Sequence, residues 1–171
     1  FFHRVVSEEY PLFGQYTPYA LSLAAKIREV AEQYALDLVH VHYAIPHATS
    51  AFLAKEMLKP RRLPTVTTLH GTDITLVGMM PSYYEITRFS IEKSDAVTTV
   101  SEFLKRETIS EFHIDHPIDV IHNFVDTELF RPQDDSPARC RLARDGERIL
   151  MHVSNFRKVK NPPVILQLFH E

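Results

Sequence analysis

The sequence has few of the residues that mark several common protein classes. Its 171 residues include no tryptophan, one cysteine and only four glycines. A single thiol, Cys140, excludes a disulfide framework and is typical of a reducing compartment, so we expect a cytoplasmic location. The few glycines form neither a G-x-G-x-x-G motif nor a P-loop, which argues against a dinucleotide-dependent dehydrogenase and against an NTPase.

Blocks of like charge and long apolar runs are also missing. The formal net charge is −3, which argues against a nucleic-acid-binding surface as the main function. No apolar run reaches the roughly 18 residues of a membrane span, and we expect no signal peptide. The hydrophobic share of 44% and the charged share of 24% are those of an ordinary soluble globular protein.

Short β-branched or apolar runs alternate with segments of helical periodicity. This alternation predicts right-handed crossovers and an α/β fold with a doubly wound, Rossmann-like parallel sheet that has helices on both faces. Thr17, followed by Pro18, and Ser101 are the predicted N-caps of two helices. The predicted strands cover residues 1–6, 36–44, 63–70, 95–101 and 117–126, and the predicted helices cover residues 17–34, 45–58, 82–94 and 101–112.

A change in composition divides the chain. Residues 1–126 form the predicted Rossmann-like domain, and the polar, proline-containing residues 127–147 read as an interdomain linker with a short helix at 137–143. Residues 148–171 read as a strand, a loop and a helix that open a second Rossmann-like domain. Because the chain starts in strand-like sequence and ends in helix-like sequence, we expect both ends to be truncated and this fragment to be inactive alone.

Polar side chains follow nearly every predicted strand, whereas the strand interiors are apolar. Open parallel sheets bind their ligands outside the carboxyl ends of the strands, so these residues are the candidates for a site. Polar residues also end strands for purely structural reasons, and that alternative stays open for each of them. The candidates are His40, His42, Tyr43, His70, Gly71, Thr72, Asp73, Ser101, Asn123, Asp126, Ser154, Asn155, Arg157 and Lys160.

The turn His70-Gly71-Thr72-Asp73 stands out among the candidates. Gly71 permits a positive φ or the close approach of a ligand, and Thr72 or Asp73 is able to cap a following helical turn. His70 is then a hydrogen-bond donor at the strand tip. A turn that only redirects the chain, with a buried and satisfied histidine, is the alternative.

The pair His40 and His42 raises the alternative of a metal site. Histidines at i and i+2 on a strand point to the same face, so with His70 they suggest a metal-dependent hydrolase. A metallohydrolase barrel of that type needs roughly 250 residues, however. The pattern therefore favours one histidine at the edge of the core and one near the pocket, with no metal.

Two cations, Arg157 and Lys160, directly follow the strand predicted from residue 148 and precede a helix. Cations beside a helix N-terminus form a phosphate site, so the pattern is typical of a protein that binds a phosphorylated ligand. The alternative is an ordinary solvated basic turn.

Five motifs in this order resemble the retaining GT-B glycosyltransferases, and the resemblance spans nearly the whole chain. They are HVHYAIPHA (40–48), VTTLHGTDIT (66–75), RFSIEKSDAVTTVS (88–101), IHNFVD (121–126) and HVSNFRKVK (152–160). The first and last are similar to the branch that acts in bacillithiol biosynthesis. The resemblance implies transfer of N-acetylglucosamine from UDP-N-acetylglucosamine to L-malate, with retained anomeric configuration and without a cofactor or a metal ion.

The same resemblance implies roles for eight residues of this sequence. His70 would hydrogen-bond the transferred sugar, Arg157 and Lys160 would neutralise the leaving diphosphate, and Asn155 would lie near the donor. Tyr43 and Thr68 would line the acceptor pocket, Asp73 would orient the turn, and Asn123 would shape the floor of the cleft. Another small acceptor, such as an inositol phosphate, a metal-dependent hydrolase and a non-catalytic α/β interaction domain stay open, as does homo-oligomerisation.

Overall fold

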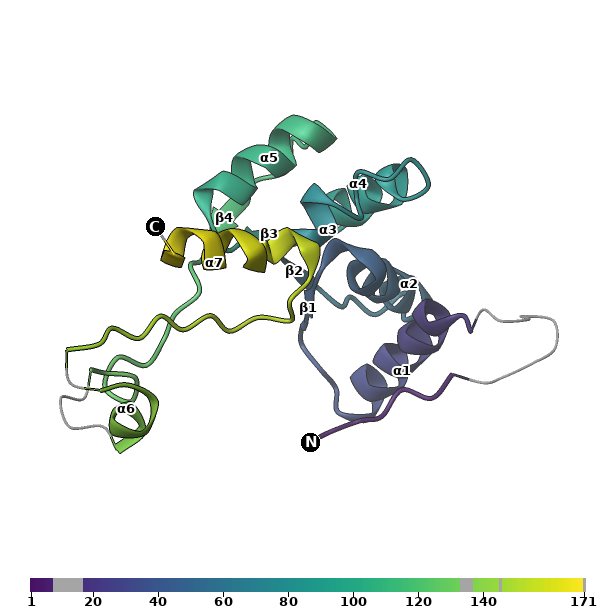
Figure 1. Cartoon of the computed structure of the whole chain (residues 1–171). Helices are drawn as coiled ribbons and strands as arrows, with labels where there is room; N and C mark the ends of the chain where they lie inside the picture. The colour runs from purple at the N-terminus through teal and green to yellow at the C-terminus, as the bar shows by residue number, and fades with distance from the viewer. Residues whose placement is uncertain (8–16, 133–136, 145, 171) are drawn as a thin grey trace. The chain divides into compact units, whose positions relative to one another are not determined.

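The computed structural model describes residues 1–7, 17–132, 137–144 and 146–170 of the chain. The chain divides into two compact units, Phe1–Phe124 and Val125–Glu171, and each is considered by itself (Figure 1). The polar linker predicted from residue 127 begins close to the point where the second unit starts. Within the described residues, no helix combines the length and the apolar character of a membrane span.

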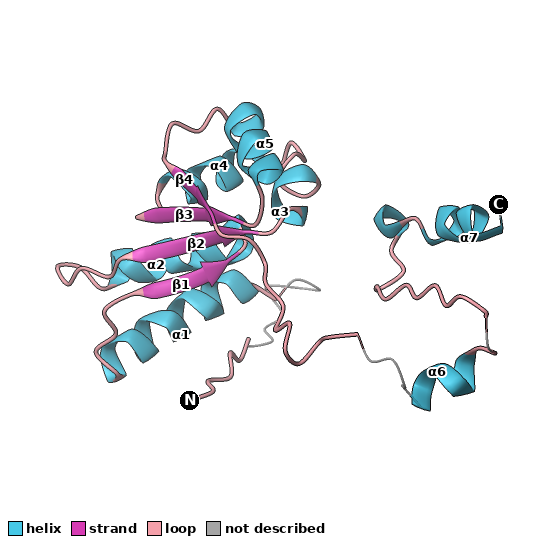
Figure 2. Cartoon of the chain, turned by 90° about the vertical axis from the view of Figure 1, so that its left-hand side faces the viewer, coloured by secondary structure: helices cyan, strands magenta, loops and turns pink. Residues whose placement is uncertain are grey.

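The first unit is built on a sheet of four parallel strands in the order β1-β2-β3-β4. The predicted parallel α/β fold is confirmed, and the strand arrows run in one direction (Figure 2). Each strand is shorter than its predicted range, because the ladder of paired residues covers only three to five positions of each strand. The strands are β1 (Val39–His42), β2 (Thr65–Leu69), β3 (Ala96–Thr99) and β4 (Ile118–Val120).

Helices follow the strands as the hydrophobic pattern predicts. Ser101 caps α5, since its Oγ accepts a hydrogen bond from the Leu104 N–H at 3.2 Å. Thr17 is not the N-cap of α1, which is a correction: Pro18 holds that position, and no side chain caps the helix. The helical elements are α1 (Tyr19–Gln33), η2 (Ala44–Ala48), α2 (Thr49–Met57), α3 (Thr72–Thr75), α4 (Tyr84–Glu92) and α5 (Glu102–Phe112).

The core of the first unit lies on one face of the sheet. Val41, Val97 and Ile118 are buried on this face, and side chains of the helices pack against them. Figure 2 shows α2 and α4 behind the strands. The described helices of the first unit therefore cover one face, whereas helices were predicted on both. Because side chains alternate along a strand, His40 and His42 point to the opposite face, where both are exposed.

Asp95 joins three elements at the amino-terminal edge of the sheet. Its Oδ2 accepts hydrogen bonds from Lys55 Nζ at 2.6 Å and from the Thr65 N–H at 2.9 Å. Burial acts to raise the pKa of the Asp95 carboxyl, but these hydrogen bonds and the Lys55 charge outweigh it, so the pKa is lowered from 3.8. A carboxyl with a lowered folded-state pKa stabilises the fold above its unfolded pKa and loses that contribution as the pH falls through the folded pKa.

We therefore expect Asp95→Asn to flatten the acid side of the stability profile. Between about pH 6 and about pH 3, the wild-type full-length protein should lose more unfolding free energy than the variant, because only the wild type has this carboxylate to protonate. Urea unfolding at a series of pH values measures the difference. Parallel profiles for the two proteins would contradict the assignment.

The second unit contains three short helical elements among its described residues: α6 (Pro137–Leu142), η3 (Lys158–Lys160) and α7 (Pro162–His170).

The predicted strands at residues 148–156 and 1–6 are wrong for the described residues, which have no strand there. A strand exists only when a neighbour completes its hydrogen bonds, and an apolar pattern alone does not supply that neighbour. Residues 8–16 lie outside the described part of the chain.

Candidate active site

The carboxyl ends of β1 and β2 bring together the histidines that the sequence singled out. In the parallel register His42 pairs with Thr68, so Tyr43 and His70 follow at the same edge of the sheet. The rings of His42 and His70 have centroids 5.0 Å apart, and those of Tyr43 and His70 are 5.1 Å apart. His70 is half-buried. The structure thus brings the rings of His42, Tyr43 and His70 together at one edge of this sheet.

Asp73 builds the turn that carries His70. Its side chain is 3% exposed, and its Oδ1 accepts hydrogen bonds from the N–H groups of His70 and Gly71 at 3.2 and 3.0 Å. Its Oδ2 accepts the Ala44 N–H at 3.0 Å. Gly71 has a φ of 117°, which a side chain at this position would strain. One carboxylate thus ties the end of β1 to the turn after β2, and substrate binding by Asp73 stays a prediction.

Thr68 lies within a hydrogen-bonded row that crosses three strands. Its Oγ1 is 2.7 Å from His40 Nε2 and 2.7 Å from Thr98 Oγ1. Thr68 is 9% exposed, so little of its surface is open to a ligand. Burial, followed by the nearby His42 and His70, lowers the pKa of His40, which favours a neutral ring in this row.

The histidines do not form a metal site in the described part of the chain. No group of three His, Cys, Asp or Glu side chains with the geometry for a metal ion occurs among those residues. His40 Nε2 faces Thr68, and His42 Nδ1 faces His70 Nε2 at 2.8 Å. One ring nitrogen of each of these three histidines is thus engaged in a hydrogen bond between side chains.

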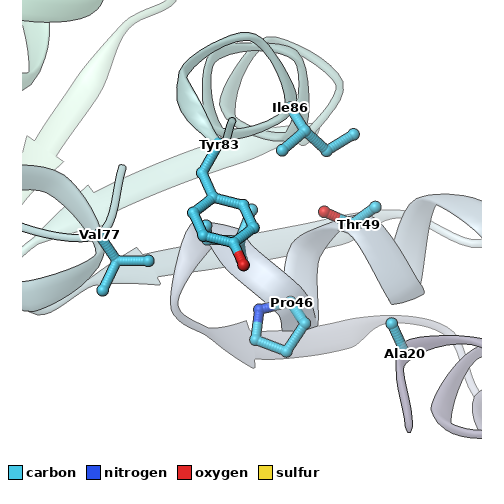
Figure 3. Close-up of a pocket in the computed structure, with 7 residues that line it drawn as sticks. Ala20, Pro46, Thr49, Val77, Tyr83 and Ile86 are labelled. Atoms are coloured by element: carbon cyan, nitrogen blue, oxygen red, sulfur yellow. The ribbon is translucent and has the colours of Figure 1, made fainter. Parts of the chain in front are cut away.

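A pocket of about 440 Å³ lies beside η2, separate from the histidine cluster (Figure 3). None of its lining side chains is charged, so it offers no cation to a carboxylate ligand. The nearby Arg88 has its Nε 3.2 Å from Glu92 Oε1. The pocket is lined by Ala20, Ile45, Pro46, Thr49, Val77, Tyr83 and Ile86.

Asn123 follows β4 at the same edge of the sheet and is exposed. Asn155, Arg157 and Lys160 belong to the second unit and are exposed as well. Arg157 and Lys160 bracket the η3 turn, in which the Lys160 N–H donates to the Arg157 carbonyl at 2.8 Å. The predicted roles of these residues toward a donor stay predictions.

The helix that follows the basic turn has an unusual N-terminus. Helix α7 begins with Pro162 and Pro163, which lack the N–H groups that a helix N-terminus ordinarily offers to an anion. The Val164 N–H donates to the Asn161 carbonyl at 3.2 Å. An anion at this turn would therefore depend on the Arg157 and Lys160 side chains and on the helix dipole, more than on backbone donors.

Comparison with known proteins places this chain in a family. The chain matches Glycosyltransferase Family 4 over residues 1–129, and it belongs to that family. It is 45% identical over 170 residues to the N-acetyl-alpha-D-glucosaminyl L-malate synthase of Bacillus anthracis. That match covers 99% of this chain and 44% of the relative, so the chain spans less than half of the relative's length.

Two more distant relatives match shorter segments. An uncharacterised glycosyltransferase of Methanocaldococcus jannaschii is 26% identical over 108 residues, which are 63% of this chain and 29% of that protein. The D-inositol 3-phosphate glycosyltransferase of Mycobacterium ulcerans is 32% identical over 79 residues, which are 45% of this chain and 17% of that protein. The resemblance to retaining GT-B enzymes predicted from the motifs is thereby confirmed at the level of the family.

Sequence reasoning missed the hydrogen bond between His42 and His70. The alternation of side chains predicted that His40 and His42 share a face, but not which residue of the next strand lies opposite each of them. The register is the missing information: a shift by one residue would pair His42 with a residue whose side chain points to the other face.

Proposed function

We propose that the full-length protein is a retaining glycosyltransferase that transfers N-acetylglucosamine from UDP-N-acetylglucosamine to the hydroxyl of L-malate, in bacillithiol biosynthesis. The observation that carries the proposal is the 45% identity to the Bacillus anthracis synthase over 99% of this chain. The matched segment of 170 residues spans the strand-end turns of the first unit and the basic turn of the second.

The geometry of the first unit supports an orienting role for His70. The Asp73 carboxylate fixes the backbone at His70 and Gly71, and the imidazole is half-buried beside Tyr43. A donor held this firmly contributes by fixing the position of a sugar hydroxyl relative to the acceptor. Tyr43, which is 38% exposed, and Thr68 would face the acceptor, and Asn123 would shape the floor of the site.

The second unit would supply the positive charge that stabilises the leaving diphosphate. As the sugar departs, negative charge grows on the diphosphate, and Arg157 and Lys160 would stabilise it more in the transition state than in the ground state. Asn155 would contact the donor. We propose that these cations serve in place of a metal ion and that the leaving phosphate helps to deprotonate the acceptor hydroxyl.

What supports malate over a phosphorylated acceptor is the comparison: the match to the L-malate synthase covers 99% of this chain, whereas the match to the D-inositol 3-phosphate glycosyltransferase covers 45%. The Arg88 guanidinium is paired with Glu92 and the lining of the pocket is uncharged, so neither decides between a carboxylate and a phosphate ligand. Membership of a glycosyltransferase family also argues against the metal-dependent hydrolase that the histidine pattern had raised.

One incubation tests the proposal. Full-length protein, UDP-N-acetylglucosamine and an equimolar panel of small hydroxy acids and inositol phosphates are combined, and the products are identified by mass spectrometry. We expect the N-acetylglucosamine conjugate of L-malate to dominate, and the D-malate and succinate controls to give none. A dominant conjugate of an inositol phosphate would contradict the assignment of malate, and the absence of any conjugate would contradict transfer.

A further inference from the structure

The rings of His42 and His70 are joined by a hydrogen bond. His42 Nδ1 lies 2.8 Å from His70 Nε2, and the two rings are tilted by 41° with centroids 5.0 Å apart. An imidazole nitrogen at this distance from another must donate or accept one proton, so the bond couples the tautomers of the two rings. No other side chain of the described residues hydrogen-bonds either ring.

The backbone of His42 is held at several points, which gives its ring a defined starting position. His42 lies in the β1–β2 ladder opposite Thr68, and the next N–H, that of Tyr43, donates to the Thr68 carbonyl at 2.9 Å. The His42 carbonyl accepts a hydrogen bond from His47 Nδ1. The ring also packs against His40, with centroids 4.7 Å apart.

We propose that His42 is a positioning residue for His70. In this assignment His42 Nδ1–H donates to His70 Nε2, which places the proton of neutral His70 on Nδ1. The Asp73 carboxylate fixes the backbone of His70, and His42 fixes its ring and tautomer. His70 then presents a single N–H donor to the ligand without having to reorganise during the reaction.

This inference rests on the proposed function, in which His70 Nδ1 donates to the transferred sugar. The same bond in the opposite sense would leave His70 Nδ1 as an acceptor. A sugar hydroxyl then would have to donate its own proton, and the negative charge of a nearby diphosphate would be unfavourable next to that lone pair. A site for a sugar nucleotide therefore favours the tautomer in which His70 Nδ1 carries the proton and donates it in a hydrogen bond.

Three substitutions of His42, to Asn, Gln and Leu, separate a positioning role from the loss of side-chain volume. In His42→Asn the side-chain amide takes the place of Nδ1 and is able to donate to His70. In His42→Gln the amide takes the place of the distant Nε2 and does not reach it. We expect His42→Gln and His42→Leu to lower kcat about 5- to 10-fold with the donor KM changed less than about twofold, and His42→Asn to stay within about threefold of wild type.

A double-mutant cycle in the full-length enzyme tests the coupling. If His42 acts through His70, then His42→Leu costs its full factor in the wild-type background and less than about twofold in the His70→Ala background. His116→Leu, at the amino end of β4, is the matched histidine control and should be neutral. Thermal unfolding of each variant establishes that the first unit is folded.

The outcomes distinguish this inference from the proposed function. Factors that multiply in the double variant, or a His42→Gln variant as active as His42→Asn, would overturn positioning by His42 while leaving transfer to malate intact. A His70→Ala variant with wild-type turnover would instead overturn the role of His70 itself, and His42 would lose its role with it.

Discussion

Replacing Asp73 with alanine should open the end of the sheet. The substitution would remove the acceptor of three backbone N–H groups, those of Ala44, His70 and Gly71, in a region where Ala44 and Asp73 are almost inaccessible to water. Each buried donor left unpaired costs about 1–3 kcal/mol, and some relaxation is available, so we expect a loss of about 3 kcal/mol.

Hydrogen exchange in the full-length protein measures this effect where it occurs. In peptides covering residues 39–48 and 65–75, the open state from which amides exchange should be about 100-fold more populated than in wild type. This factor follows from a loss of about 3 kcal/mol, because every 1.4 kcal/mol is about a factor of ten. Asp73→Asn retains one oxygen for the N–H groups of His70 and Gly71, but its NH2 group cannot accept a hydrogen bond from the Ala44 N–H. The exchange of both segments in this variant should therefore lie between that of the wild type and that of Asp73→Ala.

The matched control is Asp115→Ala, at an exposed position before β4. It should leave the exchange of both segments unchanged. If Asp73→Ala behaved like Asp115→Ala, the carboxylate would not hold the turn, and the account of how His70 is placed would be wrong.

Removing the cations of the η3 turn should have the largest effect on catalysis. Arg157→Ala and Lys160→Ala in the full-length enzyme should each lower kcat about 100-fold or more, because each would remove charge that acts on the developing diphosphate. The N–H donors missing at Pro162 and Pro163 make the side chains harder to replace at this turn. Steady-state kinetics with varied donor and saturating L-malate measures the change.

The chain offers a close control for this experiment. Lys158 lies between the two cations in the same turn and has no proposed contact, so Lys158→Ala should stay within about twofold of wild type. An equal loss in all three variants would indicate a diffuse basic surface, not two specific contacts. Unchanged activity in Arg157→Ala and Lys160→Ala would contradict a catalytic role for the turn.

The order of elements in the first unit was predictable because its signals are local. The β-branched run before His70 gave β2, and Ser101 gave the start of α5 through its capping hydroxyl. The Thr17 cap was wrong because the helix starts at Tyr19 and not at Pro18, so Pro18 takes the N-cap position. Strands at residues 1–6 and 148–156 failed because strand formation depends on partners that the local pattern does not specify.

The candidate site was predictable in membership but not in its contacts. Parallel strands bring their carboxyl ends to one edge, so Tyr43, His70 and Asp73 were expected near one another. The register that sets His42 beside His70, and the reach of the Asp73 carboxylate to Ala44, depend on long-range packing. The spacing of His40 and His42 therefore left a metal site open as the less favoured alternative, and it did not predict the hydrogen bond between His42 and His70.

The anomeric configuration of the product is the most direct test of the central claim, which is retaining transfer of N-acetylglucosamine to L-malate. Full-length enzyme is incubated with UDP-N-acetylglucosamine and L-malate, and the product is examined by proton NMR before it is purified. The account predicts an α-linked N-acetylglucosaminyl malate, recognised by a small coupling constant between H1 and H2 of the sugar. A β-linked conjugate, or free N-acetylglucosamine with malate unchanged, would contradict it.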